Sequence, residues 1–263
     1  MMTMTGRILL NEANKALLIL WRYKFNTIAE MVQKCLGFLA IGFLLGQGHL
    51  DPARMAWVLP GWMMYFYARI VLFEINQGIT DEAATGTLEQ LYMSRVSPRV
   101  LLLGRLLGIL VVATITVFVS VVLLSLLIGI RLSLRWEALP VMVLTLAGLF
   151  GCSLMFGGAA LIFKRVQALA DVAQDLILFT NGTFVAISLL PRWLQDFCLA
   201  LPTTYGIIVL RRVTLNGESL VALWRDNSLP LLIAHSTLYI VVGWLTFLAC
   251  ERVARRQGSL GQY

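Results

Sequence analysis

The sequence predicts an all-α integral membrane protein, a single transmembrane domain with six membrane-spanning helices. Its 263 residues are 59% hydrophobic and only 13% charged, whereas soluble domains average about 45–50% apolar and about 25% charged residues. A run of 25 positions between Arg105 and Arg131 carries no charge, which is enough for a helix to cross about 30 Å of hydrocarbon. One long polar stretch, 74–105, interrupts a chain that is otherwise mostly apolar.

The net charge of +7 fits basic residues at the ends of membrane spans. Nucleic acid is therefore not an expected partner, whereas membrane lipids are. The four cysteines lie in different apolar segments, without the spacing of a metal site or a disulfide pair; they are Cys35, Cys152, Cys198 and Cys250. We expect them to pack as small apolar residues. No metal-binding residues are predicted.

Residues 1–25 are predicted to form a helix that lies in the membrane interface. Apolar residues recur there at helical spacing, at Leu10, Ala13, Leu17, Leu20 and Trp21. Trp21 and Tyr23 stand beside two basic residues, a combination typical of the boundary between lipid and water. A solvated helix is the alternative.

The first two predicted spans, 28–45 and 55–75, each contain charged residues. In the first, Glu30 and Lys34 are four positions apart, so they can form an ion pair along the helix. In the second, Arg69 would cost about 2.5–3.5 kcal/mol at the centre of a lipid-facing helix, so it should face protein, water or an acidic partner. Arg69 either belongs to a polar path or a lock between helices, or extends its guanidinium to the nearby interface.

An aromatic face accompanies that arginine. Trp62, Phe66, Arg69 and Phe73 follow one another at spacings of four, three and four, so they share one side of a helix. Such a face suits a route for a lipid or a glycan, and it equally suits packing between helices.

The polar stretch contains three signals for helix starts. Thr80 precedes two acidic residues, and Gly86 lies three positions before Glu89, so both sites favour carboxylates in a first helical turn. We therefore expect two short helices over 80–97. Ser97-Pro98 combines a capping hydroxyl with a proline at the first helical position, which predicts a third span over 98–130.

Three further spans are predicted at 138–163, 176–190 and 229–250. The first of them carries four glycines that allow close approach of another helix; they are Gly148, Gly151, Gly157 and Gly158. The last contains His235, which suits either a structural hydrogen bond or a proton relay. Between the last two spans, 191–226 is apolar but broken by prolines, which predicts re-entrant helices shielded by protein or water.

Two motifs in this chain resemble those of a known family. The first reads Glu82-x-x-x-Gly86-Thr87-Leu88-Glu89-x-Leu91, followed by Ser97-Pro98 and Gly104-Arg105. It resembles the loop between the second and third spans of type 2 ABC transporter permeases, which forms a coupling helix on a separate ATPase subunit. The resemblance implies that ATPase coupling involves Glu82, Gly86, Thr87, Leu88, Glu89, Leu91, Ser97 and Pro98.

The second motif comprises Leu190-Pro191-x-Trp193-Leu194-Gln195 and Leu201-Pro202-Thr203-Thr204-Tyr205. It is similar to the region between the fifth and sixth spans of the same family, where short external helices close the translocation path. Combined with the aromatic face, it gives the residues expected to form the path or its gate: Trp62, Phe66, Arg69, Pro191, Trp193, Pro202 and Tyr205.

The distribution of basic residues predicts the topology. With both termini in the cytoplasm, 13 of the 21 lysines and arginines fall on the inner side and 7 on the outer, with Arg69 inside a span. This excess favours cytoplasmic termini, and it places the 80–97 region in the cytoplasm.

The chain has no Gly-x-x-x-x-Gly-Lys-Ser/Thr loop for nucleotide phosphates. No catalytic residues and no bound cofactor are therefore expected, and ATP with magnesium would bind a partner ATPase. The resemblance implies a permease in the bacterial inner membrane, paired with a second copy of itself, that exports a drug, a lipid or a lipid-linked glycan. An intramembrane enzyme and a membrane assembly scaffold are the alternatives.

Overall fold

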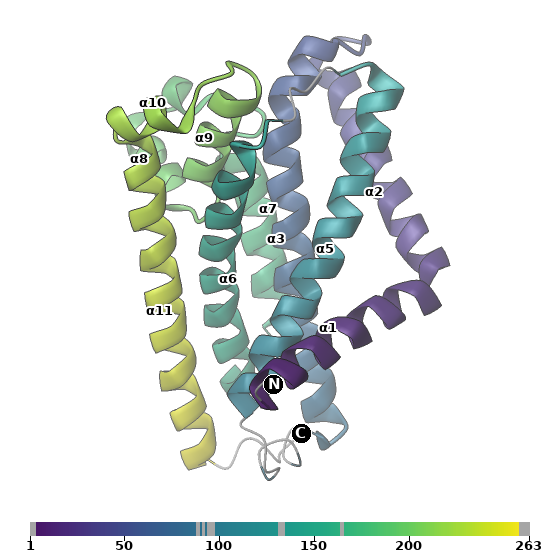
Figure 1. Cartoon of the computed structure of the whole chain (residues 1–263), viewed down its shortest axis with the longest axis vertical. Helices are drawn as coiled ribbons and strands as arrows, with labels where there is room; N and C mark the ends of the chain where they lie inside the picture. Colours follow the sequence, from purple (N-terminus) through teal and green to yellow (C-terminus); the bar gives the residue numbers. More distant parts are fainter. Residues whose placement is uncertain are drawn as a thin grey trace.

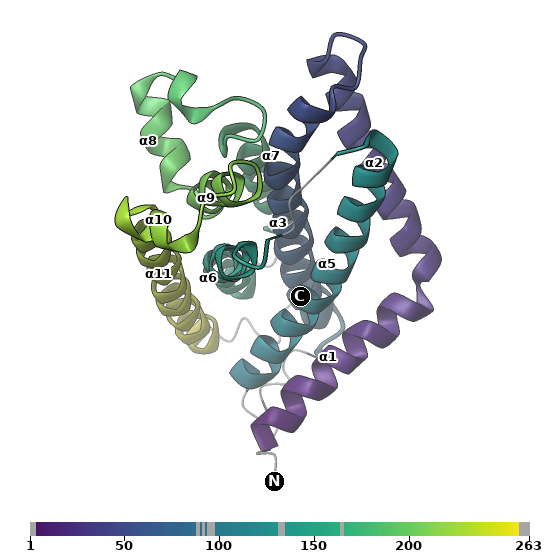
Figure 2. The ribbon, with the colours of Figure 1, turned by 45° about the horizontal axis from the view of Figure 1, so that its top comes forward.

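The computed structural model describes residues 4–87, 90, 93, 98–130, 135–163 and 166–257. In these residues the secondary structure is entirely helical (Figures 1 and 2). The elements are α1 (Met4–Arg22), α2 (Lys24–Leu45), α3 (Pro52–Ala84), α5 (Pro98–Ile128), α6 (Ala138–Phe163), α7 (Gln167–Thr180), η1 (Ile187–Leu189), α8 (Arg192–Ala200), α9 (Thr204–Thr214), α10 (Leu220–Arg225) and α11 (Ser228–Gln257). The all-α prediction is confirmed.

Within the described residues, five helices are long and apolar enough to cross a membrane: α2, α3, α5, α6 and α11. A sixth candidate is the pair α8 and α9, whose axes differ by 87° across a short break. The prediction of a multi-pass membrane protein is therefore confirmed, although the sixth candidate is a bent pair and not one straight helix.

The long helices run alternately up and down, and this order places distant segments at the same end (Figure 1). α3 descends, α5 ascends and α6 descends again. The start of α1, the end of α3, the start of α5 and the end of α11 all lie at the lower end, whereas α8, α9 and α10 lie at the upper end. Because α6 ends at the bottom and α11 begins at the top, α7 and the segment after it return the chain upward.

The helix α3 is longer than the sequence suggested. We predicted a span ending at residue 75 and a new helix beginning at Thr80, whereas α3 continues without a break to Ala84. Ile75 and Ile79 are buried one helical turn apart against α5 and α6, so the apolar side of the helix extends past the predicted end. The predicted helix start at Thr80 is therefore wrong.

The fifth predicted span is misplaced. We predicted a helix over 176–190, whereas α7 runs from Gln167 to Thr180 and gives way to an irregular segment at Asn181. Ala170, Gln174 and Ile177 are buried at spacings of four and three, so helical periodicity begins well before the charged residues end. We missed this helical periodicity because Asp171 and Asp175 suggested a loop, whereas both lie on the exposed side of α7.

The close packing of α6 on α11 depends on glycines. A Cβ atom on Gly243 would lie 1.9 Å from the carbonyl oxygen of Gly151, and one on Gly151 would lie 2.3 Å from the backbone of Tyr239. No side chain fits at either contact, so the two backbones touch directly. The expectation that glycines in the 138–163 span allow close approach is confirmed for this pair.

Glycines also seat α1 against α5. Cβ atoms on Gly104 and Gly108 would lie 3.2 Å from the side chain of Glu12 and 3.1 Å from that of Ala16. α1 therefore crosses the lower half of α5 (Figure 2). The predicted helix over residues 1–25 is present from Met4 to Arg22, while its location in a membrane interface stays a prediction.

Candidate functional site

An ion pair joins the end of α3 to α5. The guanidinium of Arg105 donates to the carboxylate of Glu82 at 2.5 Å, and both side chains are largely buried. Glu82, predicted as a contact for an ATPase subunit, is thus engaged within the chain. The pair connects the last turn of α3 to the second turn of α5.

A second group of charges joins α5 to α11. The carboxylate of Glu251 is 1% exposed and accepts hydrogen bonds from Arg99 and from Arg255, each at 2.8 Å. Sequence reasoning missed this residue. The signal was present, since Glu251 follows a long apolar run and stands four positions before Arg255, the spacing of a helical ion pair.

The turn after α3 contains the other described residues of the predicted coupling region. Gly86 has a φ of +71°, which is the left-handed conformation that ends many helices. Thr85 and Thr87 are exposed, and their hydroxyls lie 2.9 Å apart. Of the remaining predicted residues, Pro98 begins α5 as expected, whereas Leu88, Glu89, Leu91 and Ser97 lie outside the described residues.

The predicted aromatic face of α3 is divided between the core and the surface. Trp62 and Phe66 are 4% and 2% exposed and pack with Phe38, Tyr65 and Phe184. Arg69 and Phe73 are exposed, and the Arg69 guanidinium donates to the Tyr65 hydroxyl at 3.2 Å. Trp62 and Phe66 therefore pack between helices, whereas Arg69 and Phe73 are exposed.

The predicted gate residues near α8 and α9 also separate into two sets. Pro191 precedes α8, where Trp193 is 72% exposed, so both lie on the outer side of that helix. Pro202 is buried at the 87° bend between α8 and α9, next to Tyr205 in the first turn of α9. Tyr205 and Trp62 belong to different side-chain clusters, so the structure does not unite the seven predicted residues in one site.

The bend is held against α11 through the last carbonyl of α8. The Tyr239 hydroxyl donates to the Ala200 carbonyl at 2.6 Å, and a ring nitrogen of His235 lies 3.3 Å from the same oxygen. The His235 ring is also in edge contact with Tyr205 and Tyr239, with centroids 5.1 Å apart in each pair. This arrangement fits the structural alternative for His235.

Arg211, near the end of α9, fixes that helix to the start of α3. Its guanidinium stacks on the Trp57 ring at 3.6 Å and donates to the carbonyl of Trp57 at 2.8 Å. Two further bonds reach the carbonyls of Gly182 and Thr183 after α7. Since a guanidinium presents its donors in a fixed plane, one side chain connects three segments.

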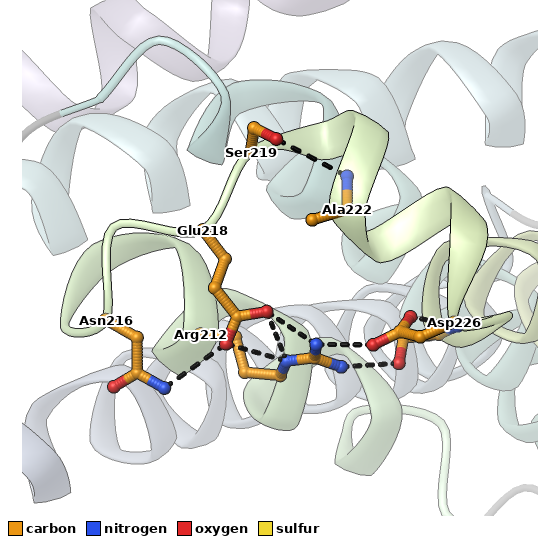
Figure 3. A network of polar contacts seen from close by, with 7 residues as sticks. Arg212, Asn216, Glu218, Ser219, Ala222 and Asp226 are labelled. Carbon is orange, nitrogen blue, oxygen red and sulfur yellow. Dashed lines mark hydrogen bonds and ion pairs between the residues drawn. The ribbon is translucent and has the colours of Figure 1, made fainter.

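A charge network closes the upper corner between α9, α10 and α11 (Figure 3). Arg212 contacts the carboxylates of both Glu218 and Asp226, and Ser219 caps α10 by accepting from the Ala222 N–H at 3.3 Å. The Arg212 guanidinium lowers the pKa of the Glu218 carboxyl. A backbone hydrogen bond from Ser228, with a second contribution from Arg212, lowers the pKa of Asp226.

The features described above are contacts that join helices to one another. Within the described ranges, no three histidine, cysteine, aspartate or glutamate side chains are grouped so as to hold a metal ion. Charged clamps join α3, α5 and α11 at the lower end, and hydrogen bonds hold a bent helix pair at the upper end. Long continuous helices connect the two.

A comparison with protein families agrees with this arrangement. A family model described as ABC-2 type transporter matches residues 12–215. The match includes the end of α3, the start of α5 and the bend between α8 and α9. No curated protein matches the sequence.

Proposed function

The chain belongs to the ABC-2 type transporter family, and we propose that it is the permease subunit of an ATP-driven exporter. Membership makes it a transmembrane component of an ABC-type transporter. In the proposed assembly it pairs with a second copy and with a separate ATPase subunit that binds ATP and magnesium. It resides in a bacterial inner membrane with both termini in the cytoplasm, and it moves a drug, a lipid or a lipid-linked glycan outward.

The observation that carries the proposal is the pair of clamps at the lower end. Glu82–Arg105 connects α3 to α5, and Glu251 connects α5 to α11 through Arg99. The turn at Gly86 projects from this end beside exposed threonines. An ATPase subunit that docks there would act on three helices together, because each of them contributes a side chain to one of these partly buried ion pairs.

In the proposed mechanism, movement is transmitted from one end of the molecule to the other along α5. This helix has 31 residues, about 46 Å at about 1.5 Å per residue, and it contains no proline after Pro98 at its start. Coupling over such a distance needs a rigid element with two arrangements. Tilting of α5 on ATP-driven closure of the partner subunits would move α3 and α11 with it at the lower end.

The upper end would respond at the bent pair α8 and α9. The bend is attached to α11 through Ala200 and to α3 through Arg211. The attachment to α11 consists of Tyr239 and His235 on one carbonyl oxygen, and the attachment to α3 is the Arg211 guanidinium on the ring and carbonyl of Trp57. Neither attachment contains an ion pair. We infer that this bend opens the path when the long helices tilt.

The test is stimulation of the partner ATPase by two variants at Gly86. Proline cannot adopt a positive φ, whereas asparagine tolerates it. Gly86→Pro should therefore abolish stimulation, and Gly86→Asn should retain most of it. Both variants should insert in the membrane and copurify with a second copy, since nothing lies within 4 Å of a Cβ at this position.

Two outcomes would contradict the proposal. Normal stimulation by Gly86→Pro would mean that the turn after α3 does not couple to the ATPase. Copurification without any subunit that carries a phosphate-binding loop would favour a membrane assembly scaffold.

A further inference from the structure

A charged cavity lies on the side of the bundle away from the α8–α9 bend. It has a volume of about 370 Å³ and is lined by residues of α1, α2, α3 and α5. This volume is within the range of about 300–1,000 Å³ usual for small-molecule sites. Apolar side chains such as Ile70, Ile109 and Val112 line it together with the charged ones.

Six charged side chains line this cavity, three acidic and three basic: Glu12, Glu30, Glu74, Lys15, Lys34 and Arg105. The lining is therefore neutral overall. Glu74 lies eight residues before Glu82 on α3, about 12 Å further along that helix from its lower end at about 1.5 Å per residue, and its side chain is exposed. Charged groups at that depth in a spanning helix are costly and mark binding sites or ion paths.

The pairing of these charges is incomplete. The Lys34 ammonium is 3.8 Å from the Glu30 carboxylate, an ion-pair distance beyond that of a hydrogen bond, and its side chain is only 11% exposed. Glu74 is exposed and lies near enough to Lys34 for their charges to interact, but it makes no hydrogen bond and no close ion pair with any described residue. The cavity therefore offers the Glu74 carboxylate as a hydrogen-bond acceptor and the Lys34 ammonium as a hydrogen-bond donor to a ligand.

We infer that this cavity binds the headgroup of a zwitterionic phospholipid with a primary ammonium, namely phosphatidylethanolamine. The lipid ammonium donates to Glu74 and Glu30, and the lipid phosphate accepts from Lys34 and Lys15. The acyl chains leave along the apolar side of the cavity near Val112. The inference goes beyond transport, because it assigns a lipid that fills the space between α2 and the rest of the bundle.

The chemistry distinguishes this lipid from its neighbours in a bilayer. A choline headgroup has the same phosphate but no N–H donor, so it cannot satisfy the carboxylate of Glu74. A glycerol headgroup has a net negative charge, which a neutral lining with a free carboxylate disfavours. Selectivity for the ethanolamine headgroup should therefore depend on Glu74, and affinity for the phosphate should depend on Lys34.

The experiment is native mass spectrometry of the delipidated full chain in detergent. The protein is equilibrated with phosphatidylethanolamine, phosphatidylcholine or phosphatidylglycerol of identical acyl chains, and separately with water-soluble phosphoethanolamine. We expect retention of phosphatidylethanolamine to exceed that of the other two lipids by about tenfold, the equivalent of one hydrogen bond between charged groups. Phosphoethanolamine alone should bind far more weakly, because it lacks acyl chains.

Three variants separate the roles of the two headgroup contacts. Glu74→Gln should reduce phosphatidylethanolamine retention to the level of phosphatidylcholine, and Glu30→Gln provides the same test if the first variant fails to fold. Lys34→Gln should weaken both lipids equally and leave their ratio unchanged. Glu218→Gln, at the opposite end of the molecule, is the control and should bind as the original chain does.

Equal retention of phosphatidylethanolamine and phosphatidylcholine by the original chain would overturn the inference. So would a preference that survives Glu74→Gln and Glu30→Gln, or a preference for phosphatidylglycerol. Binding of phosphoethanolamine as tight as that of the lipid would show that the ligand is a soluble amine and not a membrane lipid.

Discussion

Among single residues, Glu251 combines burial of a charged group with two charged partners. It is 1% exposed and accepts hydrogen bonds from two arginines that reach it from different helices. Both of those arginines keep part of their surface exposed, 44% for Arg99 and 51% for Arg255. The Glu251 carboxylate therefore joins α5 to α11, while the two arginines that contact it remain partly exposed.

We expect Glu251→Gln to lower the stability of the purified protein. Arg99 and Arg255 donate to different oxygens of Glu251, and glutamine replaces one of these oxygens by an NH2 donor, so one guanidinium loses its acceptor and the negative charge is removed. Breaking a buried pair costs about 3–5 kcal/mol, and the partial exposure of both arginines reduces this to about 1–3 kcal/mol. Thermal unfolding followed by tryptophan fluorescence measures the shift, with the exposed Asp175→Asn as control. An unchanged midpoint would show that Glu251 does not clamp these helices.

At the scale of secondary structure, the elements differ in what fixes their ends. α3 ends where Gly86 adopts a positive φ, and α7 ends where the Asn181 side chain accepts from the Thr183 N–H at 3.0 Å. α5 begins at Pro98, as the Ser97-Pro98 signal predicted. Local chemistry therefore sets these boundaries, and apolar periodicity sets what lies between them.

The packing of α6 on α11 gives a prediction at this scale. Gly243→Ala should separate the two helices, since its Cβ would lie 1.9 Å from the Gly151 carbonyl oxygen and the obstacle is backbone. Overpacking of this kind costs about 1–3 kcal/mol or more. Gly37→Ala is the matched control, because its Cβ would meet the Trp62 ring at an ordinary 3.5 Å. If both variants unfold at the same temperature as the original chain, the direct backbone contact is not present.

The upper corner formed by α9, α10 and α11 should respond to acid. The pKa values of Glu218 and Asp226 are lowered in the folded protein, so these carboxylates stabilise it above the ordinary carboxyl pKa of about 4. That stabilisation is lost as the pH falls through the lowered values, where the carboxyls become protonated and leave Arg212 without partners. Thermal midpoints between pH 7 and pH 3 should therefore fall less for a Glu218→Gln, Asp226→Asn double variant. An identical decline in both proteins would contradict this account.

Predictions that rested on a few neighbouring residues were correct, whereas features that depended on which residue lies opposite in the fold were missed. The proline start of α5 and the broken region around Pro202 were predicted from a few residues each. The ion pair of Glu82 within the chain was not predicted, because its partner Arg105 lies 23 positions away in the sequence. The helix α7 was misplaced because Asp171 and Asp175 suggested a loop, although both lie on the exposed side of a helix whose other side is buried.

At the scale of the whole molecule, two ends with different chemistry are joined by continuous helices. The lower end has buried ion pairs between α3, α5 and α11, and the upper end has a bent helix pair attached by hydrogen bonds to carbonyl groups (Figure 1). Charges of opposite sign attract one another at the lower end, whereas the upper attachments, including the one from Arg211, reach uncharged carbonyl groups. A force applied at the lower end should therefore move the helices as a unit and be released at the upper bend.

The proposed coupling requires the lower end to face the cytoplasm, where ATP is. Labelling of Thr87→Cys by a membrane-impermeant maleimide measures this orientation, with Asn216→Cys at the opposite end as the matched control. We expect Thr87→Cys to react in inverted vesicles and not in intact spheroplasts, and Asn216→Cys to do the reverse. Labelling of Thr87→Cys in intact spheroplasts would place the turn outside the cell and contradict the proposed coupling.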